Sequence, residues 1–170
     1  MLRRTLDFIY DAAAWLAAIA MIGILAMVLA AIVTRQLGIN FQGTDAYAGY
    51  CMAAAGFLAL AHTLKHNEHI RVTLILGRLH GRALHGLEMW ALSAAVFLSG
   101  LFAWYSIRLA WNSHAFNDIS TGNDATPLWI PQLAMALGAV ILFIAFIDEW
   151  WLEFTGRRVV AQSEEALHNE

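Results

Sequence analysis

The sequence has few charges and few residues that interrupt helices. Charged residues make up 14% of the 170 residues, and no Asp, Glu, Lys or Arg lies inside four long apolar stretches. Transporters and pumps mark an ion or substrate route with ionisable groups inside the membrane, or with helices broken by glycine or proline. No charge and no proline lies at the middle of any of the four stretches. We therefore do not expect the chain to contain an ion pathway of its own.

The chain contains a single cysteine, Cys51, so an internal disulfide bond is excluded. Cys51 lies within the second apolar stretch, where we expect a small buried packing residue. The basic residues do not form a basic domain, so the chain is not expected to bind nucleic acid.

Each of the four apolar stretches is long enough to cross a membrane as a helix. A bilayer core about 30 Å thick requires roughly 20 helical residues, whereas a strand requires only about ten with alternating polarity. In lipid a helix also satisfies its own backbone hydrogen bonds. We predict an all-α integral membrane protein with four transmembrane helices in one membrane domain, residues 1–170, folded as a compact bundle. The predicted spans are residues 12–34, 46–64, 89–107 and 125–147, and a flexible tail is predicted for residues 159–170.

The first stretch follows Arg3 and Arg4, as the apolar core of a signal peptide would. Such a core is about 7–15 residues long. The stretch here has 23 residues, and Arg35 follows it directly. We therefore expect an uncleaved first span.

Eight of the ten basic residues fall on one side of the predicted spans. By the positive-inside rule this side faces the cytoplasm, so both termini are predicted to be inside. Tryptophans support this topology, because all seven fall at or near predicted helix ends, where aromatic residues collect. The eight basic residues are Arg3, Arg4, Lys65, Arg71, Arg78, Arg82, Arg157 and Arg158, against Arg35 and Arg108 on the other side.

The connector between the second and third spans, residues 66–87, has the pattern of an amphipathic helix. Its apolar residues lie on a different face from a basic stripe that consists of Arg71, Arg78, Arg82 and His85. Such a segment lies in the membrane interface, where its basic side chains contact anionic lipid head groups. Gly77 and Gly81 weaken the helix, and a solvated charged connector is the alternative interpretation.

The seven histidines raise the question of a haem or a metal site. Bound haem requires two histidines at matching depth on facing helices. His62 and His114 lie about a membrane thickness apart in the predicted topology, and the other histidines lie outside the core. His62, His66 and His69 share one helical face, but no carboxylate or cysteine joins them there, and lipid phosphate is an equally suitable partner. We expect neither haem nor a tightly bound metal.

Several short motifs occur in a specific order along the four spans. A basic residue closes the first span, an acidic residue opens the second, a glycine lies within it, a tetrapeptide follows its exit, and two prolines mark the entry to the last span. In chain order the motif residues are Arg35, Asp45, Gly56, His69, Ile70, Arg71, Val72, Pro127 and Pro131. With four spans, they resemble the small, Q-type (DctQ-like) membrane subunit of tripartite ATP-independent periplasmic (TRAP) transporters over almost the whole chain. That family more often has Glu at the position of Asp45.

The resemblance implies a small permease subunit, not an enzyme, in a bacterial inner membrane. Its partners would be a large multi-span permease subunit, a periplasmic substrate-binding protein and membrane lipids. In that family a sodium gradient drives the uptake of organic acids, and the large subunit binds the sodium, so no cofactor is expected on this chain. The small subunit would act as a scaffold for the large one. Two alternatives stay open, namely a small membrane anchor of a haem or quinone complex and a stand-alone four-span protein.

Any contact with the binding protein is expected at the two outer loops, whose polar residues face the periplasm in the predicted topology. The candidate docking residues are Arg35, Asn40, Gln42, Asn117, Asp118, Asn123 and Asp124.

The topology is testable by cysteine-accessibility labelling in a background without Cys51. We expect a cysteine at Asn123 to react with a membrane-impermeant reagent added outside the cell, and cysteines at Thr73 and Ser163 to be protected until the cells are opened. Labelling of the Thr73 position from outside would contradict the orientation, because the basic connector would then face outwards.

Overall fold

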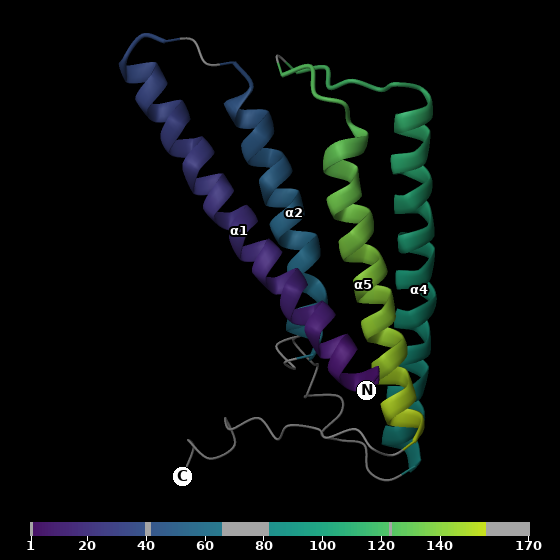
Figure 1. Ribbon diagram of the computed structural model, residues 1–170. Coiled ribbons are helices and arrows are strands. Elements are labelled where there is room, and N and C mark those ends of the chain that lie inside the picture. Colours follow the sequence, from purple (N-terminus) through teal and green to yellow (C-terminus); the bar gives the residue numbers. More distant parts are fainter. Residues whose placement is uncertain (1, 40–41, 66–81, 123, 156–170) are drawn as a thin grey trace, which may run out of the picture.

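The computed structural model describes residues 2–39, 42–65, 82–122 and 124–155, and all of its named elements are helices. They are α1 (Leu2–Gln36), α2 (Thr44–Lys65), α4 (Arg82–Ala115) and α5 (Trp129–Phe154) (Figure 1). Each is long and apolar enough to cross a membrane. The prediction of an all-helical protein with four helices able to span a membrane is therefore confirmed.

Most helices extend beyond their predicted spans, α1 from Leu2 and α4 to Ala115 among them, and two further differences concern the connectors. The last span was predicted from residue 125, but α5 begins at Trp129 because Ala125 has a φ of 46° and Pro127 forms a β-bridge with Ile119. Pro131 lies in the first turn of α5. The N–H groups of a first turn have no acceptor within the helix, so the missing N–H of proline costs no hydrogen bond there. α4 begins at Arg82, so the last six residues of the predicted connector 66–87 belong to this helix, and residues 66–81 lie outside the described part of the chain.

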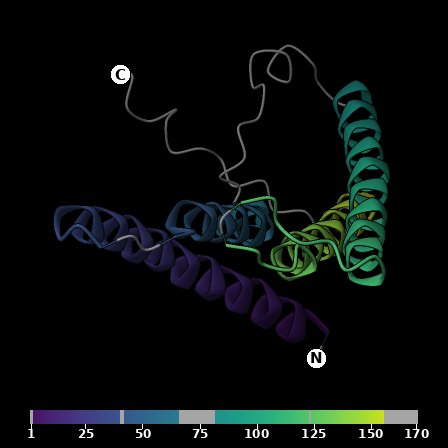
Figure 2. The same cartoon turned by 90° about the horizontal axis from the view of Figure 1, so that it is seen from above.

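The four helices form an open row in the order α1, α2, α5, α4 (Figure 2). Extensive contacts join neighbours in this row, whereas α1 meets α5 only marginally. The expected compact bundle is therefore wrong. Lipid surrounds an apolar side chain as favourably as another helix does, so apolar surface alone does not close the row. Large apolar side chains accordingly lie exposed along α1, among them Trp15, Ile22 and Leu29.

Small residues set the helix contacts. A Cβ at Gly138 of α5 would lie 2.5 Å from the backbone oxygen of Phe57 in α2, so only glycine allows this approach. A Cβ at Gly23 of α1 would lie 3.0 Å from Cys51 Sγ, and one at Gly100 of α4 would lie 2.9 Å from the Phe143 ring of α5. Cys51 is thus a packing residue against α1, but it is half-buried and not buried as expected.

The contact between α4 and α5 follows a seam of mostly small residues on α4. Along this seam the buried side chains recur at intervals of three, four or seven residues, as in a coiled coil. Small side chains allow close packing in lipid, where dispersion and hydrogen bonds hold helices together. The seam residues are Leu92, Ser99, Ala103, Ser106, Ala110 and Ser113.

Ion pairs join the same neighbours at the end of the row where α1 begins and α2 ends, which we call the terminal end. His62 Nδ1 lies 3.7 Å from Asp11 Oδ1, linking α2 to α1. Lys65 pairs with Asp148 and, at 3.1 Å, with Glu149, linking α2 to α5.

A further pair links α4 to α5, with His85 Nδ1 lying 2.8 Å from Glu153 Oε1. Glu149 and Glu153 are buried, and buried carboxylates require such partners. Each pair of neighbouring helices in the row therefore has its own contact to a carboxylate, which is an ion pair for Lys65 and becomes one for His62 and His85 when the imidazole is protonated.

The close approach at Gly138 is testable by a matched pair of substitutions. We expect Gly138→Ala to lower the free energy of unfolding by about 1–3 kcal/mol, because the methyl group forces α5 away from the Phe57 backbone. Gly49→Ala on α2 is the control, since a Cβ there meets nothing within 4 Å, and alanine favours a helix. Unfolding of the purified chain by a denaturing detergent measures both. Equal midpoints for Gly138→Ala and the wild type would contradict the contact.

Candidate partner-binding site at the loop end

The two connecting loops, residues 37–43 and 116–128, lie together at the end of the row opposite the ion pairs (Figure 1). We call this the loop end. Both loops leave their helices through the same turn. Gly38 at φ 70° ends α1, with Ile39 N–H donating to Thr34 O at 2.9 Å, and Asn117 at φ 52° ends α4, with Asp118 N–H donating to Ser113 O at 2.9 Å. Both have the pattern of a Schellman motif, which glycine and asparagine favour. Asn117, a candidate docking residue, thus also has a structural role.

The second loop is braced as a short hairpin. The amide of Ser120 donates to Thr126 O at 2.8 Å, and the amide of Leu128 donates to Asp118 O at 3.0 Å. These two bonds flank the β-bridge between Ile119 and Pro127. The loop backbone is therefore held in one shape.

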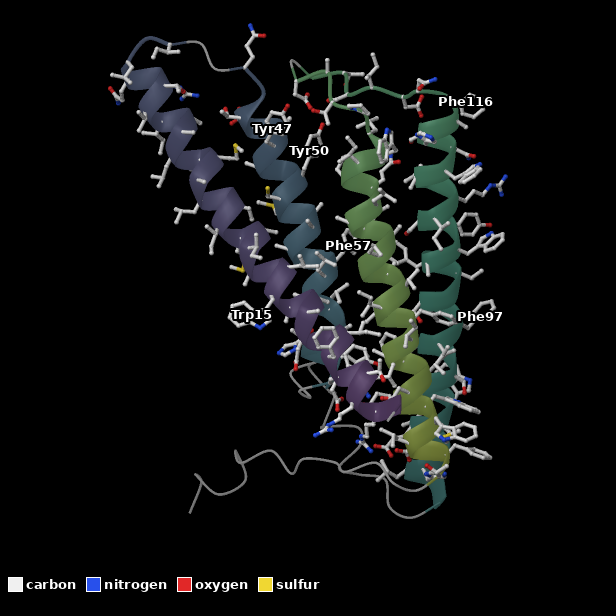
Figure 3. The ribbon with its side chains drawn as sticks, in the orientation of Figure 1. Trp15, Tyr47, Tyr50, Phe57, Phe97 and Phe116 are labelled. Carbon is white, nitrogen blue, oxygen red and sulfur yellow. The ribbon has the colours of Figure 1, made fainter. Side chains whose placement is uncertain are left out.

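Asp124 fastens this hairpin to α2. The Tyr50 hydroxyl donates to Asp124 Oδ2 at 2.9 Å, and the Ser120 hydroxyl donates to Oδ1 at 2.8 Å. The Thr126 hydroxyl reaches the Tyr47 phenol oxygen at 3.4 Å, and the two tyrosine rings meet edge to face. Figure 3 shows both tyrosines near the loop end of α2, close to the second loop.

Hydrogen bonds from Thr126, Ser120 and Tyr50 lower the pKa of Asp124 from 3.8 to about 2. The carboxylate is therefore charged at any physiological pH, and its acceptor oxygens are used in holding the loop. The sequence analysis placed Asp124 in a docking surface and did not identify Tyr47 and Tyr50. The only signal for the tyrosines was two hydroxyl-bearing rings three residues apart in the first turns of a span.

The first loop contacts Asp124 of the second loop through Gly43. Gly43 has a φ of 88°, and a Cβ there would lie 2.8 Å from Asp124 Cβ. Glycine is thus required for both its backbone conformation and its contact. The two loops consequently form one surface.

A polar cavity of about 390 Å³ opens beside Gly43, between the end of α1 and the start of α2. Arg35, Gln42 and Asp45 line it, and Gly122 of the second loop completes it. All three of these side chains are exposed, and the described residues show no ion pair between Arg35 and Asp45. A guanidinium and a carboxylate are therefore available to a ligand or partner of mixed charge.

The structure separates the candidate docking residues into two groups. Arg35 and Gln42 lie at the cavity near α1, whereas Asn117 and the exposed Asp118 lie at the end of α4, the other edge of the row. Asp124 lies between them as the anchor. Asn40 and Asn123 lie outside the described residues.

The other residues singled out from the sequence lie elsewhere. Gly56 lies on an open face of α2, where an apolar groove of about 480 Å³ runs from Gly49 to Leu60. His85 lies in α4 beside Glu153, with its side chain 57% exposed, and the side chain of Arg82 is not described. His69, Ile70, Arg71, Val72 and Arg78 lie outside the described residues.

Histidines do not gather in the described part of the chain. His62 lies beside Asp11 at the terminal end, and His114 lies against the Trp129 ring at the loop end. Within residues 2–39, 42–65, 82–122 and 124–155, no three His, Cys, Asp or Glu residues form a group that suits a metal ion. His62 and His114 are too far apart to share one haem.

The anchoring role of Asp124 is testable against Asp118. We expect Asp124→Asn to speed amide hydrogen exchange at Ser120 and Leu128, because it weakens the bonds from Tyr50 and Ser120. Asp118→Asn should leave that exchange unchanged, because the side chain of Asp118 makes no hydrogen bond to the described residues of the loop. Lowering the pH from 7 to 4 should also leave the loop closed, since a depressed carboxyl pKa places the loss of its stabilising effect near pH 2. Equal exchange in both variants would contradict the anchor.

Comparison with known proteins gives one family. Residues 24–156 match the family model of the DctQ component of tripartite ATP-independent periplasmic transporters. No curated protein sequence matches the chain.

Proposed function

Since the chain belongs to the DctQ component family of TRAP transporters, we propose that it is the scaffold subunit that holds the large permease subunit in a bacterial inner membrane. Through that partner it serves sodium-driven uptake of an organic acid, which a periplasmic binding protein delivers. Substrate and sodium bind to the large subunit in this proposal, and this chain binds neither. The observation that carries the proposal is the open row of helices, which leaves broad apolar faces uncovered.

The face of α2 that carries Gly49 and Gly56 is the proposed contact with the large subunit. Glycines at helix contacts inside the chain have tight neighbours, as Gly23, Gly100 and Gly138 show. Gly49 and Gly56 meet nothing within 4 Å, although each glycine costs a helix about 1 kcal/mol relative to alanine. They lie seven residues apart, on the same side of α2, along the apolar groove. A helix from a partner can approach the α2 backbone closely at such a face.

The basic residues Arg3, Arg4 and Lys65 at the terminal end support an orientation in which the loop end faces the periplasm. In this orientation the binding protein docks on the surface formed by the two loops. The cavity with Arg35, Gln42 and Asp45 offers both charge signs to it, and Asp118 offers a carboxylate at the opposite edge. We assign Asp124 to holding the surface in shape. At the cytoplasmic side, the proposed lipid contacts are Arg71, Arg78, Arg82 and His85.

Reconstitution tests the scaffold role. We expect liposomes with this chain alone to take up no organic acid under a sodium gradient, and uptake to require the large subunit and the binding protein. Gly56→Leu should reduce co-purification of the large subunit about tenfold, since overpacking costs about 1–3 kcal/mol and 1.4 kcal/mol is tenfold in affinity. Gly86→Leu is the matched control, because Gly86 also lies exposed in a helix with nothing within 4 Å, but outside this face.

Two results would contradict the proposal at different levels. Uptake by this chain alone would refute the scaffold role. Full co-purification with Gly56→Leu would leave the scaffold role intact and would show that the contact lies elsewhere than on α2.

The docking surface is tested by Asp118→Lys in the same uptake assay. This variant should lower uptake at limiting binding protein without changing co-purification, and unchanged uptake would place the dock on the large subunit alone.

A further inference from the structure

A second apolar groove, separate from the α2 face, runs between α4 and α5 near the loop end. It has a volume of about 410 Å³ and is lined by the Ile107–His114 side of α4 and the Trp129–Ala136 side of α5. Two small buried residues, Ala110 and Ala136, form its floor. Its walls are large and exposed, with Trp111 at 72% and Leu133 at 44%. The groove therefore opens sideways, in the direction in which lipid meets the row.

The polarity of the groove changes along its length. Ile107, Leu133 and Ala136 make the deeper part apolar, while His114 and Trp129 lie at the loop end with their rings 5.2 Å apart and edge to face. The described residues show no hydrogen bond from the indole N–H groups of Trp111 or Trp129 to the protein. No Asp or Glu lines the groove. Its rim thus presents donors without a competing carboxylate, which suits the ester and phosphate oxygens of a lipid.

We propose that this groove holds one acyl chain of a phospholipid from the leaflet at the loop end, with the ester and phosphate region at His114 and the two indole N–H groups. The volume is in the range of small-molecule sites, about 300–1,000 Å³. The aromatic rim also matches the depth at which Trp residues meet lipid head groups. The bound lipid would fill the groove beside the α4–α5 seam, over Ala110 and Ala136.

The test is photo-crosslinking of the full-length chain, assembled with the large permease subunit, in vesicles of phosphatidylethanolamine and phosphatidylglycerol. A phospholipid with a diazirine in its acyl chain is activated by light, and labelled peptides are mapped by mass spectrometry. We expect labelling of the groove peptides of α4 and α5 to exceed labelling of the lipid-facing side of α1, which serves as the reference for unbound lipid. This comparison requires no variant. Groove labelling equal to that of α1 would overturn the proposal.

A matched pair of variants gives an independent readout. Leu133→Trp fills the groove from its exposed wall and should abolish the excess labelling. Leu101→Trp makes the same change at a similarly exposed position of α4, 42% against 44%, outside the groove, and should preserve it. Persistent excess labelling in Leu133→Trp overturns the proposal. So does excess labelling that appears only when the chain is reconstituted without the large subunit, because a protein segment then occupies the groove in the assembly, and the proposed scaffold role still stands.

Discussion

In lipid, an apolar side chain gains little by moving from the bilayer to another helix, and this constraint shapes the whole structure. Close approach of helices and pairing of polar groups therefore supply much of what holds them together. Each neighbouring pair in the row has a tight contact at a glycine and at least one polar pair. Gly23 with Cys51 and His62 with Asp11 join α1 to α2, Gly138 with Phe57 and Lys65 with Glu149 join α2 to α5, and Gly100 with Phe143 and His85 with Glu153 join α4 to α5. The close contacts hold the helices within the apolar part of the row, and the ion pairs hold its terminal end.

The membrane spans could be predicted from the sequence because length and the absence of charge are sufficient signals. Their arrangement could not. Residues 125–128 read as part of a span, yet a residue at positive φ and a β-bridge turn the chain before α5 begins. Gly138 and Gly49 look alike in the sequence, and only the structure shows that one meets a backbone within the chain and the other faces outwards. A pattern of small residues indicates that a helix can be approached closely, but it does not indicate by which partner.

The sequence predicted only part of the candidate site, because it shows which loop residues are polar but not which contacts they make within the chain. Polar residues in an outer loop suggest a surface for a partner, but Asp124 and Asn117 also have roles inside the chain, as an anchor for the loop and as a helix end. Tyr47 and Tyr50 complete the anchor from within a predicted span, 74 residues from Asp124 in the case of Tyr50, so no local pattern reveals the pairing. Arg35 and Asp45 come together because α1 and α2 are adjacent and joined by a short loop, and that proximity does follow from the sequence.

The two grooves on the row differ in what they can hold, and the difference is geometric. The α2 groove lies on one helix and contains two glycines, so its floor is backbone that a second helix can reach. Lipid chains gain little from such a floor, because a flexible chain packs against larger side chains equally well. The α4–α5 groove lies between two helices, with alanines at its floor and tryptophans at its rim, which is the arrangement on which the proposed lipid site rests. The two proposed contacts therefore use different parts of the row, the backbone of one inner helix for a protein and the groove between two helices for a lipid.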